Sequence, residues 1–222
     1  MSSFSGRSRG FRAIVFDVDG TLVEIPSSWA YFHKALGTFE GALRNAELYY
    51  SGQISYEEWA QLDVSLWRGL PLARLRELAM RIKLIKGAKE TFEVLRELGI
   101  RPILLSCGLN LVVEKVAEDL GVEDYVANGL EVGPDGLLTG KAIVRVGLKD
   151  KLKVLKDLLD GLGIGLGGCV AVGDDESMIP IFRVVKLGIA FNPRSSEVAR
   201  SAHVVVRSDD LRAILPHILK EY

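Results

Sequence analysis

Acidic side chains follow two apolar runs of this sequence, where they could carry chemistry. Asp17 and Asp19 come directly after the run AIVF in AIVFDVDGTL. Asp174 and Asp175 come directly after the run VAVG further along the chain. An ionised carboxylate is costly to bury, and carboxylates about 4–6 Å apart repel each other by a few kcal/mol per pair, so these acids need a positive partner. A hard divalent cation would supply it, and ligands that are all oxygen favour magnesium over zinc.

Two further side chains extend this set toward phosphate chemistry. Ser106 ends the apolar run PILLS, and Lys151 lies at the start of a helical segment. A lysine and a hydroxyl beside a divalent cation make a pocket for a tetrahedral, doubly charged group, and phosphate is such a group. Lys151 has the neighbours Lys149 and Lys153, and a solvated helix face would explain all three equally well.

Short apolar runs alternating with helical segments would position these residues. Continuously apolar runs are typical of parallel strands covered on both faces, and they occur at 13–18, 101–106, 169–174, 187–191 and 203–207. Amphipathic helices are predicted at 86–99, 111–121 and 149–162. This alternation predicts an α/β fold with a doubly wound, Rossmann-like parallel sheet. Such sheets bind ligands beyond the carboxyl ends of their strands, which is where the acids and Ser106 lie.

Two segments break the alternation. Residues 27–83 contain four helical segments and no convincing strand, which predicts an all-helical insert after the first strand. We expect the aromatic side chains of this insert to form mostly its own core, with one or two facing a substrate. Residues 125–145 contain two extended runs around GPDG, a strong turn signal, and predict a small antiparallel β-hairpin.

Composition narrows the possible partners and the compartment. Lys and Arg total 28 against 29 Asp and Glu, a net charge of −1, so no nucleic-acid partner is expected. The two cysteines, Cys107 and Cys169, sit in apolar runs and indicate a reducing, cytoplasmic setting. No apolar run reaches membrane-spanning length, and the start MSSFSGRSRG lacks the apolar centre of a signal peptide. We therefore expect a small-molecule substrate, no membrane partner, and a monomer or homodimer.

Four segments resemble the motifs of the haloacid dehalogenase (HAD) superfamily. They are DVDGTL at 17–22, LLSCG at 104–108, Lys151, and VGDD at 172–175. The phosphoserine phosphatase-like branch is the most similar, through YVANGLEVGPDGLLTG and VAVGDDESMIPIFRVVKLGIAF, and the resemblance runs from about residue 12 to the end. It implies a catalytic core formed by residues 11–24 and 85–222, with a helical cap at 25–84. The small, polar start at 1–10 is expected to be a flexible N-terminal tail.

The resemblance also implies roles for the acids. Asp17 would be the nucleophile that forms an aspartyl-phosphate, and Asp19 the general acid and base. Asp17, the backbone carbonyl of Asp19, and Asp174 would bind Mg²⁺. The family's fourth motif often carries a second acid four residues after the first, where this chain has Met178. Asp175 is then expected to be the second acid of the metal site.

A further group of residues is expected to contact the phosphate. Ser106 would donate to a phosphoryl oxygen, and Lys151 would neutralise charge on both the nucleophile and the phosphate. Backbone N–H groups around Gly20, Cys107 and Gly108 would complete the phosphate cradle.

The residues expected to hold the leaving group differ from the family pattern. Phosphoserine phosphatases carry a glutamate nine residues after the nucleophile, where this chain has Pro26 and, nearby, Glu24. Their cap arginine corresponds here to Asp63. Glu24 and Asp63 are therefore the candidate substrate-binding residues. Since an acid repels a carboxylate, Asp63 favours a neutral or cationic leaving group, such as a polyol or amino alcohol, over phosphoserine.

The predicted function is magnesium-dependent hydrolysis of a small phosphomonoester through an aspartyl-phosphate. Three alternatives remain open at this point. One is phosphotransfer to an acceptor other than water, and another is carbon–halogen hydrolysis, which Asp19 opposes because the dehalogenases lack that second acid. The third is a catalytically idle protein that binds a phosphorylated ligand, and Met178 is the feature that favours it.

Overall fold

The structure of the protein is a computed structural model, and it describes residues 10–220. The predicted flexible tail, residues 1–10, lies outside the described residues apart from Gly10. Within the described range, no helix combines the length and the apolar character needed to cross a bilayer.

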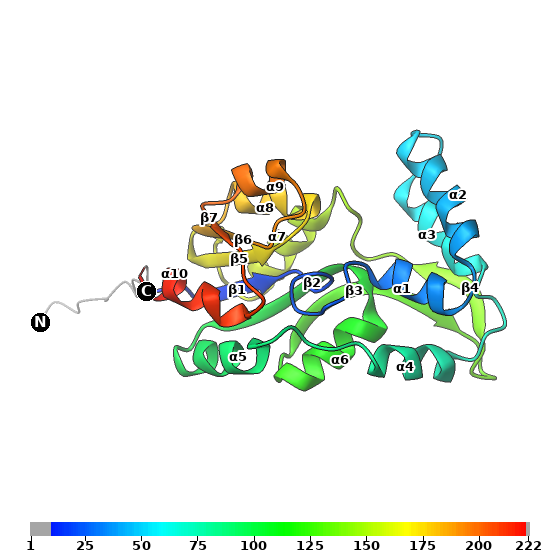
Figure 1. The fold of residues 1–222 in the computed structure, drawn as a ribbon, viewed down its shortest axis with the longest axis horizontal. Coiled ribbons are helices and arrows are strands. Elements are labelled where there is room, and N and C mark those ends of the chain that lie inside the picture. Colours follow the sequence, from blue (N-terminus) through cyan, green and yellow to red (C-terminus); the bar gives the residue numbers. More distant parts are fainter. Residues whose placement is uncertain (1–9, 221–222) are drawn as a thin grey trace, which may run out of the picture.

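A seven-stranded sheet in the order β4-β3-β2-β1-β5-β6-β7 forms the centre of the molecule (Figure 1). Neighbouring strands are parallel except for the β3–β4 pair. The α/β fold predicted from the apolar runs is confirmed. The strands are β1 (Ala13–Phe16), β2 (Arg101–Leu109), β3 (Asp124–Val132), β4 (Leu138–Ile143), β5 (Cys169–Gly173), β6 (Leu187–Phe191) and β7 (Val204–Val206).

Strand register brings the predicted reactive residues to one edge. Phe16, the last residue of β1, pairs with Leu104 of β2 and with Val172 of β5. Asp17, Ser106 and Asp174 follow these positions at the carboxyl ends of the parallel strands, where β2 continues to Leu109 with a break in its pairing after Leu105. The backbone N–H of Asp17 continues the pairing by donating to Val172 O at 2.9 Å.

Helices cover both faces of the sheet, as continuous apolar strands require. Figure 1 shows α5 and α6 beneath the sheet and α7, α8 and α9 above it. On β1, Ile14 and Phe16 join one buried cluster, while Ala13 and Val15 join another on the opposite face. The covering helices are α5 (Ala88–Glu97), α6 (Asn110–Leu120), α7 (Lys151–Gly161), α8 (Ile179–Phe182) and α9 (Ser196–Ser201), and α10 (Leu215–Leu219) lies near the C-terminus. Short 3-10 turns occur at η1 (Leu166–Gly168), η2 (Glu176–Met178) and η3 (Leu211–Ile214).

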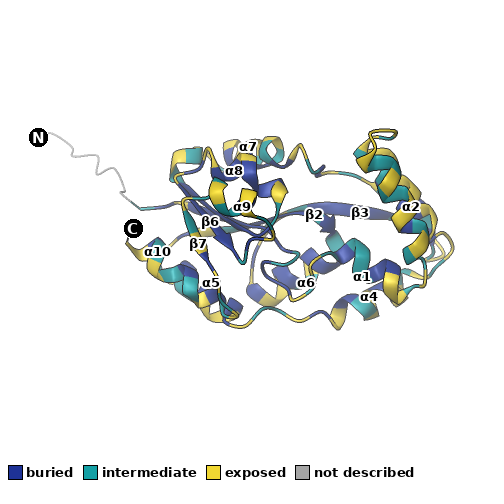
Figure 2. Cartoon of the chain, turned by 45° about the horizontal axis from the view of Figure 1, so that its top comes forward, coloured by how far each residue is buried: buried dark blue, intermediate teal, exposed yellow. Residues whose placement is uncertain are grey.

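The helical insert is present as expected but shares its core with the sheet. Its helices are α1 (Ser28–Ala35), α2 (Phe39–Tyr50), α3 (Tyr56–Ser65) and α4 (Leu72–Met80). In Figures 1 and 2, α2 and α3 project at one end of the molecule, whereas α4 lies beside α6. Phe32, Trp67 and Leu75 of the insert belong to the same buried cluster as Phe16 of β1. The insert is thus packed onto the core, and the cap boundaries 25–84 remain a prediction.

The predicted hairpin at 125–145 is confirmed and has an additional role. β3 and β4 are antiparallel around the turn at 133–136, where Gly136 has φ +78°, a conformation that favours glycine. β3 also pairs in parallel with β2, so the hairpin extends the main sheet toward the insert. There β4 packs against α3.

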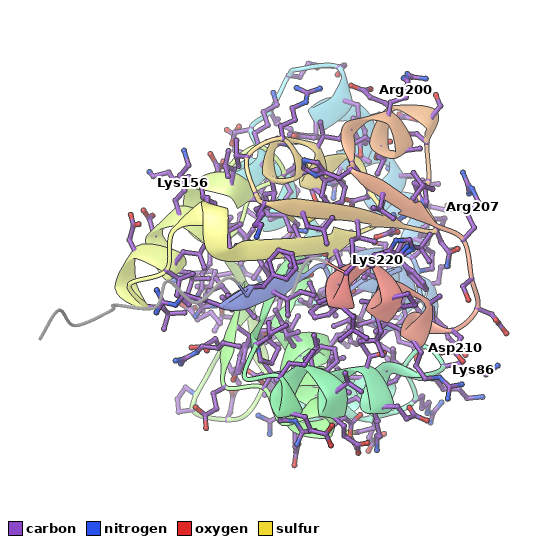
Figure 3. All side chains as sticks on the ribbon, turned by 90° about the vertical axis from the view of Figure 1, so that its left-hand side faces the viewer. Lys86, Lys156, Arg200, Arg207, Asp210 and Lys220 are labelled. Carbon is purple, nitrogen blue, oxygen red and sulfur yellow. The ribbon has the colours of Figure 1, made fainter. Side chains whose placement is uncertain are left out.

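Charged side chains at the end of the molecule opposite the insert are spread rather than gathered. Figure 3 shows Lys156, Arg200, Arg207 and Lys220 extending in different directions. Lys86 and Asp210 lie close together there, with Nζ and Oδ2 3.7 Å apart. This arrangement accords with the near-neutral net charge of −1.

Candidate active site

A buried ion pair lies at the carboxyl end of β1. Lys151 Nζ is 2.8 Å from Asp17 Oδ2, and the two side chains are 1% and 5% exposed. Lys151 is the first residue of α7 and also donates to Ser177 Oγ at 3.1 Å. Lys149 and Lys153 are exposed. The structure thus brings Lys151, among the three neighbouring lysines, to the predicted nucleophile.

Burial and neighbouring acids dominate the electrostatics of this edge. Burial raises the pKa of Asp17 from 3.8 to about 7, and Asp174 and Asp175 raise it as well, although Lys151 opposes them. Burial likewise raises the pKa of Asp174 to about 6, against the lowering effect of Arg194. Burial lowers the pKa of Lys151, but Asp17 more than compensates, so its net pKa is raised and the ammonium stays charged.

Asp19 has one occupied and one free carboxylate oxygen. Its Oδ2 accepts from the backbone N–H of Ser28 at 2.6 Å and from Ser28 Oγ at 2.7 Å. Ser28 is held there because Ser27 caps the start of α1. Oδ1 is buried without a hydrogen-bond partner among the described residues. Burial raises the pKa of Asp19 despite the bonds from Ser28, which suits a group that must both give and accept a proton.

The irregular end of β2 at Ser106–Gly108 forms a close-fitting cradle. Ser106 is 1% exposed, and its Oγ accepts from the Gly108 N–H at 2.9 Å. A β-carbon at Gly108 would lie 2.7 Å from Asp19 Oδ2 and 3.0 Å from Ser106 Oγ, so only glycine fits this position. Asp19 and Ser106 therefore face the same small space.

Cys107 contributes its backbone to the site rather than its thiol. Its carbonyl oxygen accepts from Trp29 Nε1 and Tyr56 Oη, both at 3.0 Å, and from Asn128 Nδ2 at 2.8 Å. Burial raises the pKa of the thiol to about 12, so the thiolate that a cysteine nucleophile needs is strongly disfavoured.

The oxygen atoms expected to bind a cation lie around one point. Asp174 Oδ1 accepts from Thr21 Oγ1 at 2.9 Å, and Asp174 Oδ2 is 2.5 Å from Arg194 Nε. The same guanidinium donates to the backbone carbonyl of Asp19 at 3.2 Å. The Asp174 carboxylate and the Asp19 carbonyl therefore already bind one positive group, the Arg194 guanidinium, beside Asp17.

These donors fit Mg²⁺, which prefers oxygen ligands and takes few of them from carboxylates. No cluster of three or more His, Cys, Asp or Glu side chains arranged for a metal occurs in residues 10–220. A site built from two carboxylates and a backbone carbonyl does not require such a cluster. Asp175 Oδ1 accepts from Ser177 N–H at 3.0 Å and Ser177 Oγ at 2.6 Å, so this acid caps η2 with one oxygen.

A cavity of about 400 Å³ joins this edge of the sheet to the insert. Most of the residues predicted for the site line it: Asp17, Asp19, Ser106, Cys107, Gly108, Lys151, Asp175 and Asp63. Gly20 and Asp174 adjoin Arg194, which lines the cavity: Arg194 Nε pairs with Asp174 Oδ2, and a β-carbon at Gly20 would lie 2.5 Å from Arg194 Nη2. Glu24 is exposed and does not line the cavity, so the structure does not bring this predicted substrate residue to the site.

Four residues of the site were not among the functional residues predicted from the sequence. Thr21 and Arg194 contact Asp174, Ser28 contacts Asp19, and Ser177 contacts Lys151. Arg194 comes shortly after the carboxyl end of β6, and this position could have identified it as a site residue from the sequence. Ser28 depends on how α1 enters the insert, which the sequence does not indicate.

A comparison with known protein families assigns the chain to one of them. The family model for haloacid dehalogenase-like hydrolases matches residues 14–183, and the chain belongs to this family. The predicted family resemblance is therefore confirmed.

Within the family, the chain is similar to phosphoserine phosphatases. It is 32% identical to the enzyme of Methanocaldococcus jannaschii over 209 residues, covering 93% of this chain and 97% of that one. It is 35% identical to phosphoserine phosphatase SerB2 of Mycobacterium tuberculosis over 193 residues, covering 85% and 46%. The chain spans about half the length of SerB2 and of the Archaeoglobus fulgidus phosphoserine phosphatase, of which it covers 56%.

Solved structures show the same relationship. A structure described as a phospho-aspartyl intermediate analogue of phosphoserine phosphatase has a TM-score of 0.80 and 30% identity, covering 94% of this chain and 99% of that one. A substrate-bound phosphoserine phosphatase has a TM-score of 0.79 and 29% identity, covering 93% and 98%.

The raised pKa values of the buried acids predict a pH-dependent stability of the metal-free protein. In the unfolded chain these carboxyls ionise near 3.8, whereas in the folded chain the pKa of Asp17 is about 7. Between these values the folded chain binds more protons, so the free energy of unfolding falls as pH rises from about 4 to about 7. We expect Asp17 to account for a fall on the order of 3 kcal/mol, measured by urea unfolding with a chelator present.

The variant Asp17→Asn isolates this contribution, because the other titrating groups are shared with the unaltered protein. Its unfolding free energy should fall less steeply over the same interval. Parallel curves for the two proteins would show that the pKa of Asp17 is not raised by folding.

Proposed function

We propose that the protein is a magnesium-dependent phosphatase that hydrolyses a small phosphomonoester through an aspartyl-phosphate on Asp17. One observation carries this proposal: a buried carboxylate paired with Lys151 shares a cavity with a second acid, Asp19, that has a free oxygen. The similarity to phosphoserine phosphatases over most of the chain supports it.

In the first step, an oxygen of Asp17 attacks phosphorus as the bond from phosphorus to the ester oxygen breaks. Asp19 gives its proton to the leaving oxygen, so the products are an alcohol and the aspartyl-phosphate. The raised pKa of Asp19 supports this role, since a protonated carboxyl is needed at this stage. Lys151 and Ser106 would stabilise the negative charge that develops on the phosphoryl oxygens.

In the second step, water attacks the same phosphorus and Asp19 accepts its proton. The bond from phosphorus to the Asp17 oxygen breaks, which restores the carboxylate and releases inorganic phosphate. Mg²⁺, held by the carboxylates of Asp17 and Asp174 and the carbonyl of Asp19, would neutralise negative charge on the nucleophile and phosphate. The insert would exclude bulk water from the cavity during both steps.

Replacing the nucleophile should abolish turnover. Asp17→Asn is expected to lower phosphate release from p-nitrophenyl phosphate with Mg²⁺ by about 10³-fold or more, because an amide is a poor nucleophile. The matched control is Asp157→Asn, an exposed position on α7, which should retain activity. A chelator should remove the activity of the unaltered protein. Phosphate release that survives Asp17→Asn would rule out the mechanism.

Replacing the general acid and base should separate the two steps. Nitrophenolate leaves without needing a proton, so Asp19→Asn should still be phosphorylated by p-nitrophenyl phosphate but should hydrolyse the intermediate about 10²–10⁴-fold more slowly. We expect a burst of one nitrophenolate per chain, and a mass increase of one phosphoryl group on Asp17. A slow rate with no burst and no phosphorylated protein would contradict the role given to Asp19.

A further inference from the structure

The half of the cavity that the insert provides has aromatic walls. Trp29, Tyr50, Tyr56 and Trp59 line it, together with small apolar side chains such as Ala42 and Ala46. These four come from α1, α2 and α3, and they are more than the one or two aromatics expected to face a substrate, although Trp29 also packs against the buried core. Phe32 and Trp67 do belong to the buried core.

The polar atoms of two of these rings are already occupied. Trp29 Nε1 and Tyr56 Oη both donate to the carbonyl oxygen of Cys107, at 3.0 Å. What they offer a ligand is therefore ring surface. Both tryptophans are held by stacking, Trp29 on Trp67 and Trp59 on Tyr49, with centroids 5.9 and 4.7 Å apart. The walls therefore present mainly ring surface, and Trp59 Nε1 is a buried donor without a hydrogen-bond partner among the described residues.

A single carboxylate of the insert lines this cavity among the described residues. Asp63 is 4% exposed, its Oδ1 accepts from Asn45 Nδ2 at 2.8 Å, and its Oδ2 is 3.4 Å from His33 Nε2. The lining lysine and arginine, Lys151 and Arg194, both pair with acids at the phosphate end.

The neighbouring histidine, His33, is held within the insert. Its Nδ1 lies 2.8 Å from Thr38 Oγ1, which also accepts from Trp67 Nε1 at 3.1 Å. Its Nε2 lies 3.4 Å from Asp63 Oδ2 and has no hydrogen-bond partner among the described residues. Asp63 is thus the carboxylate that the insert presents to the cavity, and among residues 10–220 no lysine or arginine of the insert lines it.

We propose that the preferred substrate is the phosphate monoester of an amino alcohol whose leaving group carries a methylated, quaternary ammonium and no carboxylate. The inference rests on the proposed function and specifies its substrate class. Aromatic faces attract a quaternary ammonium, and its methyl groups bury against apolar side chains without needing acceptors. Asp63 supplies the opposite charge. The carboxylate of phosphoserine would meet Asp63 and the aromatic walls, with no lysine or arginine of the insert lining the cavity among residues 10–220.

Two ligands of the same shape test the charge on the unaltered protein. Phosphocholine and 3,3-dimethylbutyl phosphate differ in having nitrogen or carbon at the branched centre, so only the first is cationic there. We expect kcat/KM to be at least about tenfold higher for phosphocholine, and higher for phosphocholine than for phosphoethanolamine and phosphoserine. Equal values for the isosteric pair, or phosphoserine as the best substrate, would overturn the inference.

The variant Asp63→Asn then tests the named residue. It should lower the ratio of kcat/KM for phosphocholine to that for 3,3-dimethylbutyl phosphate by about fivefold or more, whereas Asp157→Asn should leave this ratio unchanged. An unchanged ratio in folded Asp63→Asn would overturn the role of Asp63. If Asp63→Asn does not fold, the isosteric pair on the unaltered protein decides.

The experiments distinguish failure of the proposed substrate class from failure of the proposed phosphatase function. Hydrolysis of p-nitrophenyl phosphate without a preference for the cationic ligand would overturn the substrate class and leave the phosphatase function intact. Absence of hydrolysis of every phosphomonoester, including p-nitrophenyl phosphate, would overturn the proposed function and this inference with it.

Discussion

The ion pair between Asp17 and Lys151 is the constraint on which the rest of the site depends. Both side chains are almost completely buried, and each charge would be costly in this position without the other. β1 delivers the carboxylate and the first turn of α7 delivers the ammonium, so the helix has to begin at the edge of the sheet. Lys151 pairs with Asp17 only, so Asp174 and Asp175 still repel the Asp17 carboxylate. A further cation at this edge is stabilised because it reduces that repulsion.

Features set by local patterns could be predicted from the sequence. Continuous apolar runs indicated the parallel strands, GPDG indicated the hairpin, and the rule that parallel strands bind ligands at their carboxyl ends placed Asp17, Ser106 and Asp174 at one edge. Contacts set by tertiary packing could not be predicted. The Ser28 contact depends on how α1 enters the insert, and the bond from Arg194 to Asp174 depends on the loop after β6. Nothing in the spacing of the insert's aromatics distinguishes a ring in the core from a ring that lines a cavity.

The insert couples substrate recognition to the reactive edge of the sheet. Trp29 and Tyr56 line the cavity and also donate to the Cys107 carbonyl, within the end of β2 that carries Ser106 and Gly108. Asn128 of β3 donates to the same oxygen, so the neighbouring hairpin strand also holds this end of β2. Because the insert also shares its buried core with β1, the walls of the cavity and the phosphate cradle form one packed unit.

A double-mutant cycle on Asp17 and Lys151 tests the central claim most directly. The unfolding free energies of the unaltered protein, Asp17→Asn, Lys151→Met and the double variant would be measured without metal at about pH 8, above the pKa of about 7 of Asp17. A buried, mutually dependent pair predicts a coupling energy of about 2 kcal/mol or more, with Lys151→Met much more destabilising when Asp17 is present. Additive effects of the two substitutions would contradict the account.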